Sequence, residues 1–183
     1  MEDKYTDELF EKILNHQSWP NFPEIVSELQ TIAITSFKKD TTEGYVASIL
    51  IFHQIIEEAL KTLIKLSELL VKAHIWPSEI EYQFNEERKM FGQVLGEFER
   101  SIDFKEKKEL INVAREMNGI RIGIVHKLTS RGVGDVKNEA DKFRMLYSKF
   151  MELYGKGEDS YIWMLDDLRR SVYMGFQNDL TVD

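Results

Sequence analysis

Apolar residues recur at helical spacing along almost the whole chain. The stretch over about residues 43–74 is apolar around much of its circumference, which predicts a helix in the centre of the fold. No run of alternating apolar and polar residues predicts a strand. The pattern predicts helices over about residues 5–16, 23–37, 43–74, 79–101, 104–129, 136–154 and 158–178.

Capping and breaking residues separate these segments. Asp40-Thr41-Thr42 offers an N-cap for the central helix, and both Ser78-x-x-Glu81 and Asp103-x-x-Glu106 have the form of capping boxes. Gly155-Lys156-Gly157 predicts the end of one helix before the last one begins. Short connections favour neighbouring helices that run in opposite directions. We therefore predict an all-α fold, an antiparallel up-and-down helical bundle.

The length and composition fit one domain. The chain has 183 residues, of which 43% are apolar and 31% charged, as is typical of a globular protein. We expect a single all-α domain over 1–183, in which 1–40 is an N-terminal helical extension, 43–155 is the core of the bundle and 158–178 is a C-terminal helix. No apolar run is long enough to span a bilayer, so no membrane contact is expected.

The start of the chain and its lack of cysteine bear on the compartment. Met-Glu-Asp-Lys has neither the basic nor the apolar region of an export signal. The absence of cysteine removes disulfides and thiolate chemistry and fits a reducing environment. We therefore expect a cytoplasmic protein.

Several enzyme classes lose support because their motifs are missing. None of the four histidines has a glutamate three residues before it, as helical di-iron sites require, and no His-Glu-x-x-His motif occurs. No phosphate-binding glycine loop and no Gly-x-Ser-x-Gly motif is present either. We therefore expect no bound metal and no cofactor.

One segment is basic within an acidic chain. The formal net charge is −8, from 24 basic and 32 acidic residues, so a polyanion would have to bind at a local basic patch. Residues 115–131 carry a local charge of +3, because Glu116 is their only acid. A solvated helix face would have a similar composition, so the charge leaves both interpretations open. The basic residues of this segment are Arg115, Arg121, Lys127 and Arg131.

Placing this segment on a helix separates a buried face from an outward one. Arg121 lies at the edge of the apolar stripe, and His126 lies about 140° further round the helix, with Asn118 and Ile122 between them. Ile111 falls on the same outward arc as Ile122, so a second subunit or another helix of the chain is needed to cover both. The apolar stripe itself consists of Leu110, Val113, Met117, Ile120, Ile124 and Leu128.

The motif Arg121-Ile-Gly-Ile-Val-His126 has the Arg-x4-His form of the HEPN superfamily. The segments that precede the motif resemble this superfamily as well. Upstream lie an apolar helix with Phe52-His-Gln-Ile-Ile-Glu57-Glu58, then Met90-Phe-Gly-Gln-Val-Leu-Gly96, and then a capped helix that leads into the motif. The resemblance covers about 44–155, and the layout is broadly similar to that of the mannitol operon repressor family. It implies a homodimer with the motif helices near the two-fold axis.

The resemblance also implies a function. In active members the arginine and the histidine serve metal-independent RNA cleavage, in which Arg121 would hold the phosphate and His126 would act as the base, with Asn118 as a further polar group. Arg115, Lys127 and Arg131 would bind RNA, and Ile111 and Ile122 would contact the second subunit. Active members usually carry a polar residue directly after the arginine, where this chain has Ile122.

Two functions therefore stay open at this point. The first is an RNA-binding protein that acts as an endoribonuclease of a toxin or defence kind. The second is a catalytically inactive homodimer that serves as a regulator or captures a partner protein, such as a minimal nucleotidyltransferase antitoxin. On the central helix, His53 and Glu57 predict a hydrogen-bonded core pair, or else a polar cluster near the motif.

Overall fold

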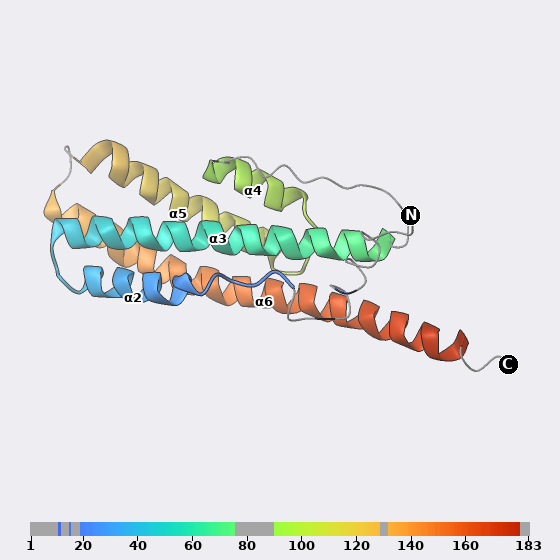
Figure 1. Cartoon of the computed structure of the whole chain (residues 1–183). Helices are drawn as coiled ribbons and strands as arrows, with labels where there is room; N and C mark the ends of the chain where they lie inside the picture. Colours follow the sequence, from blue (N-terminus) through green and yellow to red (C-terminus); the bar gives the residue numbers. More distant parts are fainter. Residues whose placement is uncertain (1–10, 12–14, 16–18, 76–89, 129–131, 180–183) are drawn as a thin grey trace.

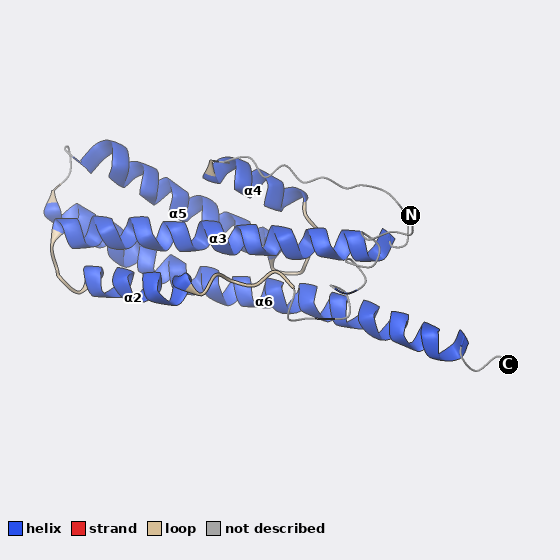
Figure 2. Cartoon of the chain, viewed as in Figure 1, coloured by secondary structure: helices blue, strands red, loops and turns tan. Residues whose placement is uncertain are grey.

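The fold is a helical bundle (Figures 1 and 2). The computed structural model describes residues 11, 15, 19–75, 90–128 and 132–179, and all regular structure among them is helical, which confirms the all-α class. The helix predicted over 5–16, apart from residues 11 and 15, and the segment 79–89 with its Ser78-x-x-Glu81 box lie outside the described residues. The helices are α2 (Ile25–Phe37), α3 (Thr42–Ile75), α4 (Phe91–Arg100), α5 (Lys107–Lys127) and α6 (Val133–Asp179).

Helix α3 forms the centre of the bundle, as its apolar pattern predicts. It packs against each of the other four helices and runs through the middle of the fold (Figure 1). Its start agrees with the predicted cap, since the Gly44 amide donates a hydrogen bond of 3.2 Å to Thr41 Oγ1. Each large apolar side chain that α3 buries contributes about 2 kcal/mol to stability. The side chains of α3 with 2% exposure or less include Tyr45, Ile49, Phe52, Ile55, Ile56, Leu60 and Leu63.

Contacts along α3 establish the direction of α4. The Phe91 ring at the start of α4 lies 4.4 Å from the His53 ring, and the Ile102 amide just past the end of α4 donates to Ser67 Oγ at 2.9 Å. Helix α4 therefore runs parallel to α3. Helix α6 also runs parallel to α3, whereas α2 and α5 run antiparallel to it (Figure 1). The predicted alternation of direction thus holds along the described helices except between α3 and α4.

The two helices predicted at the end of the chain are a single helix. Helix α6 continues through Gly155-Lys156-Gly157, so the prediction that these residues end a helix and that 158–178 is a separate one is wrong. The glycine at 157 serves packing instead, because a Cβ placed there would lie 2.6 Å from Cζ of Phe104. Helix α6 therefore spans the bundle and extends beyond the end of α3 (Figure 1).

Helix α5 begins later than predicted. Its N-cap residue, Glu106, makes no side-chain capping bond, so the Asp103-x-x-Glu106 box is not formed. The turn is held by Lys107, which is 3% exposed and whose Nζ lies 5.3 Å from the centre of the Phe98 ring. This ammonium group joins the end of α4 to the start of α5. It donates to the carbonyl oxygens of Glu99, Ser101 and Ile102, at 3.2, 2.5 and 3.3 Å.

Candidate functional site

Helix α5 carries the Arg-x4-His motif and packs against α3, α4 and α6. The predicted apolar stripe is confirmed at four positions, since Leu110, Val113, Met117 and Ile124 are buried. Leu128, which follows the last residue of α5, is 37% exposed, so the buried stripe ends before it. The motif therefore lies on a helix whose inner face packs in the core.

The two isoleucines predicted to face outward behave differently. Ile111 is 8% exposed, so its cover comes from within the chain, which is one of the two alternatives that the sequence left open. The reason is α4, which packs beside the first half of α5 and is joined to it by an ion pair between Arg115 and Glu99, one helical turn after Ile111. Ile122 is 43% exposed and Val125 is 46% exposed, so the apolar surface without cover is on the second half of α5.

Arg121 and His126 do not converge within one chain. Arg121 is half-buried, and it makes no hydrogen bond or ion pair with any described residue. His126 is exposed in the last turn of α5. Because the helix turns about 100° per residue, the two side chains leave it in directions about 140° apart. A site that uses both residues would need more than one copy of α5.

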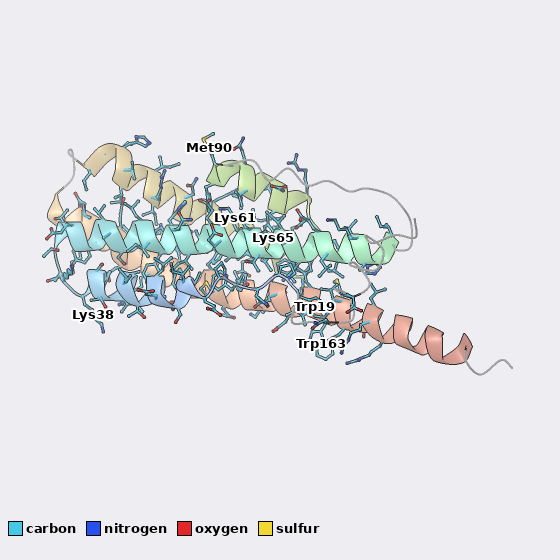
Figure 3. The ribbon with its side chains drawn as sticks, viewed as in Figure 1. Trp19, Lys38, Lys61, Lys65, Met90 and Trp163 are labelled. Carbon is cyan, nitrogen blue, oxygen red and sulfur yellow. The ribbon has the colours of Figure 1, made fainter. Side chains whose placement is uncertain are left out.

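Asn118 belongs to a polar cluster that the structure assembles from three helices. His53 Nε2 of α3 lies 3.2 Å from Asn118 Oδ1 of α5, and the His53 ring packs on Phe91 of α4. Glu57 is not the partner of His53, since its carboxylate pairs at 2.9 Å with Nζ of Lys61, which is labelled on α3 in Figure 3. The predicted core pair is therefore wrong, and the alternative of a polar cluster near the motif is confirmed. The only sequence signal for this role of His53 was a histidine within an apolar helix.

The surroundings of His53 disfavour its protonated form. Burial lowers the pKa of His53, which is 7% exposed, and the nearby positive charge of Arg121 lowers it further. The hydrogen bond with Asn118 and the charge of Glu57 act in the opposite direction on this pKa but do not cancel the effect of burial. His53 is therefore neutral at neutral pH, and its Nε2–H can donate to the Asn118 carbonyl oxygen.

This lowered pKa predicts an acid-sensitive fold. In the unfolded chain His53 has the ordinary pKa of 6.5, whereas in the folded protein its pKa is lower. The stability that neutral His53 contributes is therefore complete above about pH 6.5 and is lost as the pH falls below that value. Urea unfolding of the wild type and of His53→Leu at about pH 8 and about pH 5 tests this. We expect the wild type to lose more stability than the variant between these values, and equal losses would contradict the assignment.

The basic residues predicted to bind RNA do not form one free patch. Arg115 is paired with Glu99, Lys127 is exposed, and Arg131 lies outside the described residues. Neighbouring acids of α5 pair with α6, where Lys142 Nζ lies 2.7 Å from a Glu116 carboxylate oxygen. The pair with Glu99 therefore neutralises one positive charge of this segment on the folded surface, whereas Lys142 neutralises one of its acids. Arg121 stands apart, because no described carboxylate pairs with it.

Three further observations limit what the described residues contain. No group of three or more histidine, aspartate or glutamate side chains among them is arranged to hold a metal ion. None of their helices combines the length and the apolar character that crossing a bilayer requires. Comparison with models of protein families, with curated proteins and with solved structures finds no match to this chain.

Proposed function

We propose that this protein binds RNA at the second half of α5 and cleaves it without a metal, as the resemblance to the HEPN superfamily implies. One observation carries the proposal: Arg121 is half-buried and has no carboxylate partner among the described residues. A guanidinium group withdrawn from water normally finds an anion inside the protein, because an unpaired charge is costly to desolvate. Arg121 is thus available for an anion from outside, and its planar fork suits a phosphate group.

The proposed reaction divides the work between two residues. His126, as the neutral imidazole, takes the proton of the ribose 2′-hydroxyl, whose oxygen attacks the adjacent phosphorus. Arg121 stabilises the negative charge that develops on the phosphorane oxygens. The bond to the 5′ oxygen then breaks and that oxygen takes up a proton, which leaves a cyclic phosphate and a free 5′-hydroxyl. The step needs no oxidant, reductant or cofactor.

A homodimer is part of the proposal. In one chain the directions of Arg121 and His126 differ by about 140°, so a single α5 cannot direct both at one phosphate. A second copy packed on Ile122 and Val125, which are 43% and 46% exposed, would bring another α5 alongside and remove this apolar surface from water. Arg121 of one subunit and His126 of the other would then line a shared groove.

Cleavage of RNA in the presence of EDTA tests the proposed reaction. We expect His126→Ala and Arg121→Ala each to lower the cleavage rate about 100-fold, because each residue supplies a contact to the transition state. His74→Ala is the matched control for His126, since both are exposed histidines in the last turn of a helix. Arg170→Ala is the control for Arg121→Ala, since Arg170 is an exposed arginine on α6. Equal rates in wild type and His126→Ala would exclude cleavage by this motif.

The exposed Ile122 favours a second candidate function, a homodimer that does not cleave RNA and instead regulates or captures a partner protein. An apolar residue beside Arg121 supports an interface better than a reaction site. This candidate predicts that Ile122→Asp yields monomers in sedimentation experiments, whereas Met145→Asp, at a site on α6 that is 73% exposed, has no such effect. A dimer that depends on Ile122 but shows no RNA cleavage would favour this function over the first.

A further inference from the structure

We infer that His53 is a positioning residue for phosphate binding: it fixes the amide of Asn118 so that Asn118 and Arg121 hold one phosphate group together. The inference rests on the proposed function of α5 as an RNA-binding helix and adds to it a residue of α3 outside the Arg-x4-His motif. The phosphate in question is that of an RNA phosphodiester.

The His53 imidazole is held in place by its surroundings. It is 7% exposed, it projects from the central helix α3, and its ring packs on Phe91 at 4.4 Å between the ring centres. Side chains packed in this way keep one rotamer. Because the Asn118 Oδ1 atom can only accept, the contact of 3.2 Å assigns the proton of the neutral imidazole to Nε2, which donates to this oxygen. The carbonyl oxygen of Asn118 is therefore turned toward α3.

The orientation of the carbonyl oxygen determines where the rest of the amide lies. The Nδ2 group is on the other side of the amide carbon and carries two N–H donors. Asn118 is half-buried and makes no second hydrogen bond with a described residue. Without His53, the amide could turn over and present its oxygen, which would repel a phosphate. With His53, the amide offers donors to an anion at the surface of α5.

Arg121 lies one helical turn after Asn118, so their side chains are neighbours on α5. The guanidinium group of Arg121 is near enough to the cluster for its charge to lower the pKa of His53. The carboxylate of Glu57 also acts on His53 but is paired with Lys61 at 2.9 Å. An anion at this point of α5 would therefore meet the guanidinium of Arg121 and the amide donors of Asn118.

Binding of a fluorescein-labelled oligoribonucleotide tests the inference. His53→Leu removes the donor to Asn118, whereas His53→Gln keeps an amide N–H that reaches the same oxygen. Asn118→Asp keeps the acceptor for His53 but replaces the donors by a negative charge. We expect the dissociation constant to rise about tenfold in His53→Leu and in Asn118→Asp, because a hydrogen bond to a charged group is lost. We expect His53→Gln to bind within about threefold of wild type.

Thr62→Val is the matched control for loss of a buried polar group on α3, since Thr62 is 4% exposed and its hydroxyl donates to the carbonyl oxygen of Glu58 in its own helix. We expect it to bind RNA as the wild type does. Thermal melting of each variant verifies that it is folded. If His53→Leu does not fold, Asn118→Asp still tests the contact between Asn118 and the phosphate, and wild-type RNA binding by folded Asn118→Asp would overturn the inference.

A second readout separates positioning from a merely structural role. In a titration with inorganic phosphate followed by NMR, we expect the side-chain amide signals of Asn118 to shift in wild type and in His53→Gln, but not in folded His53→Leu. Unchanged RNA binding in both His53→Leu and Asn118→Asp, while Arg121→Ala binds weakly, would overturn this inference and leave the proposed function intact. Unchanged RNA binding in Arg121→Ala would overturn the proposed function. Asn118 side-chain signals of the wild type that do not shift with inorganic phosphate would overturn the inference about His53 and Asn118.

Discussion

Replacing Lys107 with methionine lowers the free energy of unfolding by about 3 kcal/mol. Methionine fills the space of the lysine stem but removes the ammonium group. The carbonyl oxygens of Glu99, Ser101 and Ile102 then lose a charged donor in a place that water does not reach easily. The Ile102 oxygen keeps the Tyr161 hydroxyl as a donor, so the loss falls mainly on the carbonyl oxygens of Glu99 and Ser101. Buried acceptors cost more when left unpaired than the hydrogen bond contributed when made.

The cost of burying the lysine charge works against this loss. Burial lowers the pKa of Lys107, although the charges of Asp103 and Glu99 oppose that shift, so removal of the charge recovers part of the desolvation energy. The loss of hydrogen bonds has the larger effect, because the carbonyl groups at the end of α4 have no amide donor within the helix and bond to the Lys107 ammonium group instead.

Urea unfolding followed by circular dichroism measures the effect of Lys107→Met. Lys108→Met is the matched control: the residue is adjacent, exposed and without a contact to a described carbonyl, so its replacement changes stability by less than about 0.5 kcal/mol. Equal stability of the two variants would show that the three carbonyl bonds do not hold the turn between α4 and α5.

Replacing Gly157 with alanine also destabilises the fold, by about 2 kcal/mol, although alanine is the better helix former by about 1 kcal/mol. The new Cβ would lie 2.6, 3.0 and 3.1 Å from three carbons of the Phe104 ring. The ring cannot move away easily, because it packs edge-on against Tyr161 at 5.6 Å and near Phe98 at 6.3 Å. Either the ring or α6 has to shift, and the contacts of Phe104 are weakened.

Gly155→Ala provides the control within the same segment. A Cβ at Gly155 meets nothing within 4 Å, so only the gain in helix propensity remains and stability rises by about 1 kcal/mol. The two glycines are two residues apart in one continuous helix, yet their replacements are expected to act in opposite directions. Melting temperatures of the two variants measure this directly. Stabilisation by both would mean that Phe104 does not occupy the space above Gly157.

The same pair of glycines shows where local interpretation of the sequence fails. Gly155-Lys156-Gly157 has the composition of a helix end, because glycine has a poor helix propensity. The helix continues nevertheless, since the approach of Phe104 to Gly157 outweighs the cost of glycine. No local pattern contains that contact, because Phe104 is in another part of the chain.

Helix α5 has an inner face that the sequence predicted and contacts with α4 that it did not. The apolar stripe of α5 predicted the inner face correctly at Leu110, Met117 and Ile124, because helical periodicity is a local property. The sequence left open whether a second subunit or another helix covers Ile111, since the position of α4 beside the first half of α5 is not written in the periodicity of either helix. The same limit applied to Arg115, whose charge is paired with Glu99 of α4.

Helical periodicity was enough to predict that this protein is helical, that the segment over about 43–74 is its centre, and that the inner face of α5 is apolar. Each of these follows from spacing within one segment, where 3.6 residues complete a turn. The packing of the helices was needed to show that His53 bonds to Asn118, across 65 positions of sequence, and that Arg121 is left without a carboxylate among the described residues. Pairings of this kind depend on how the helices pack, which periodicity within one helix does not encode.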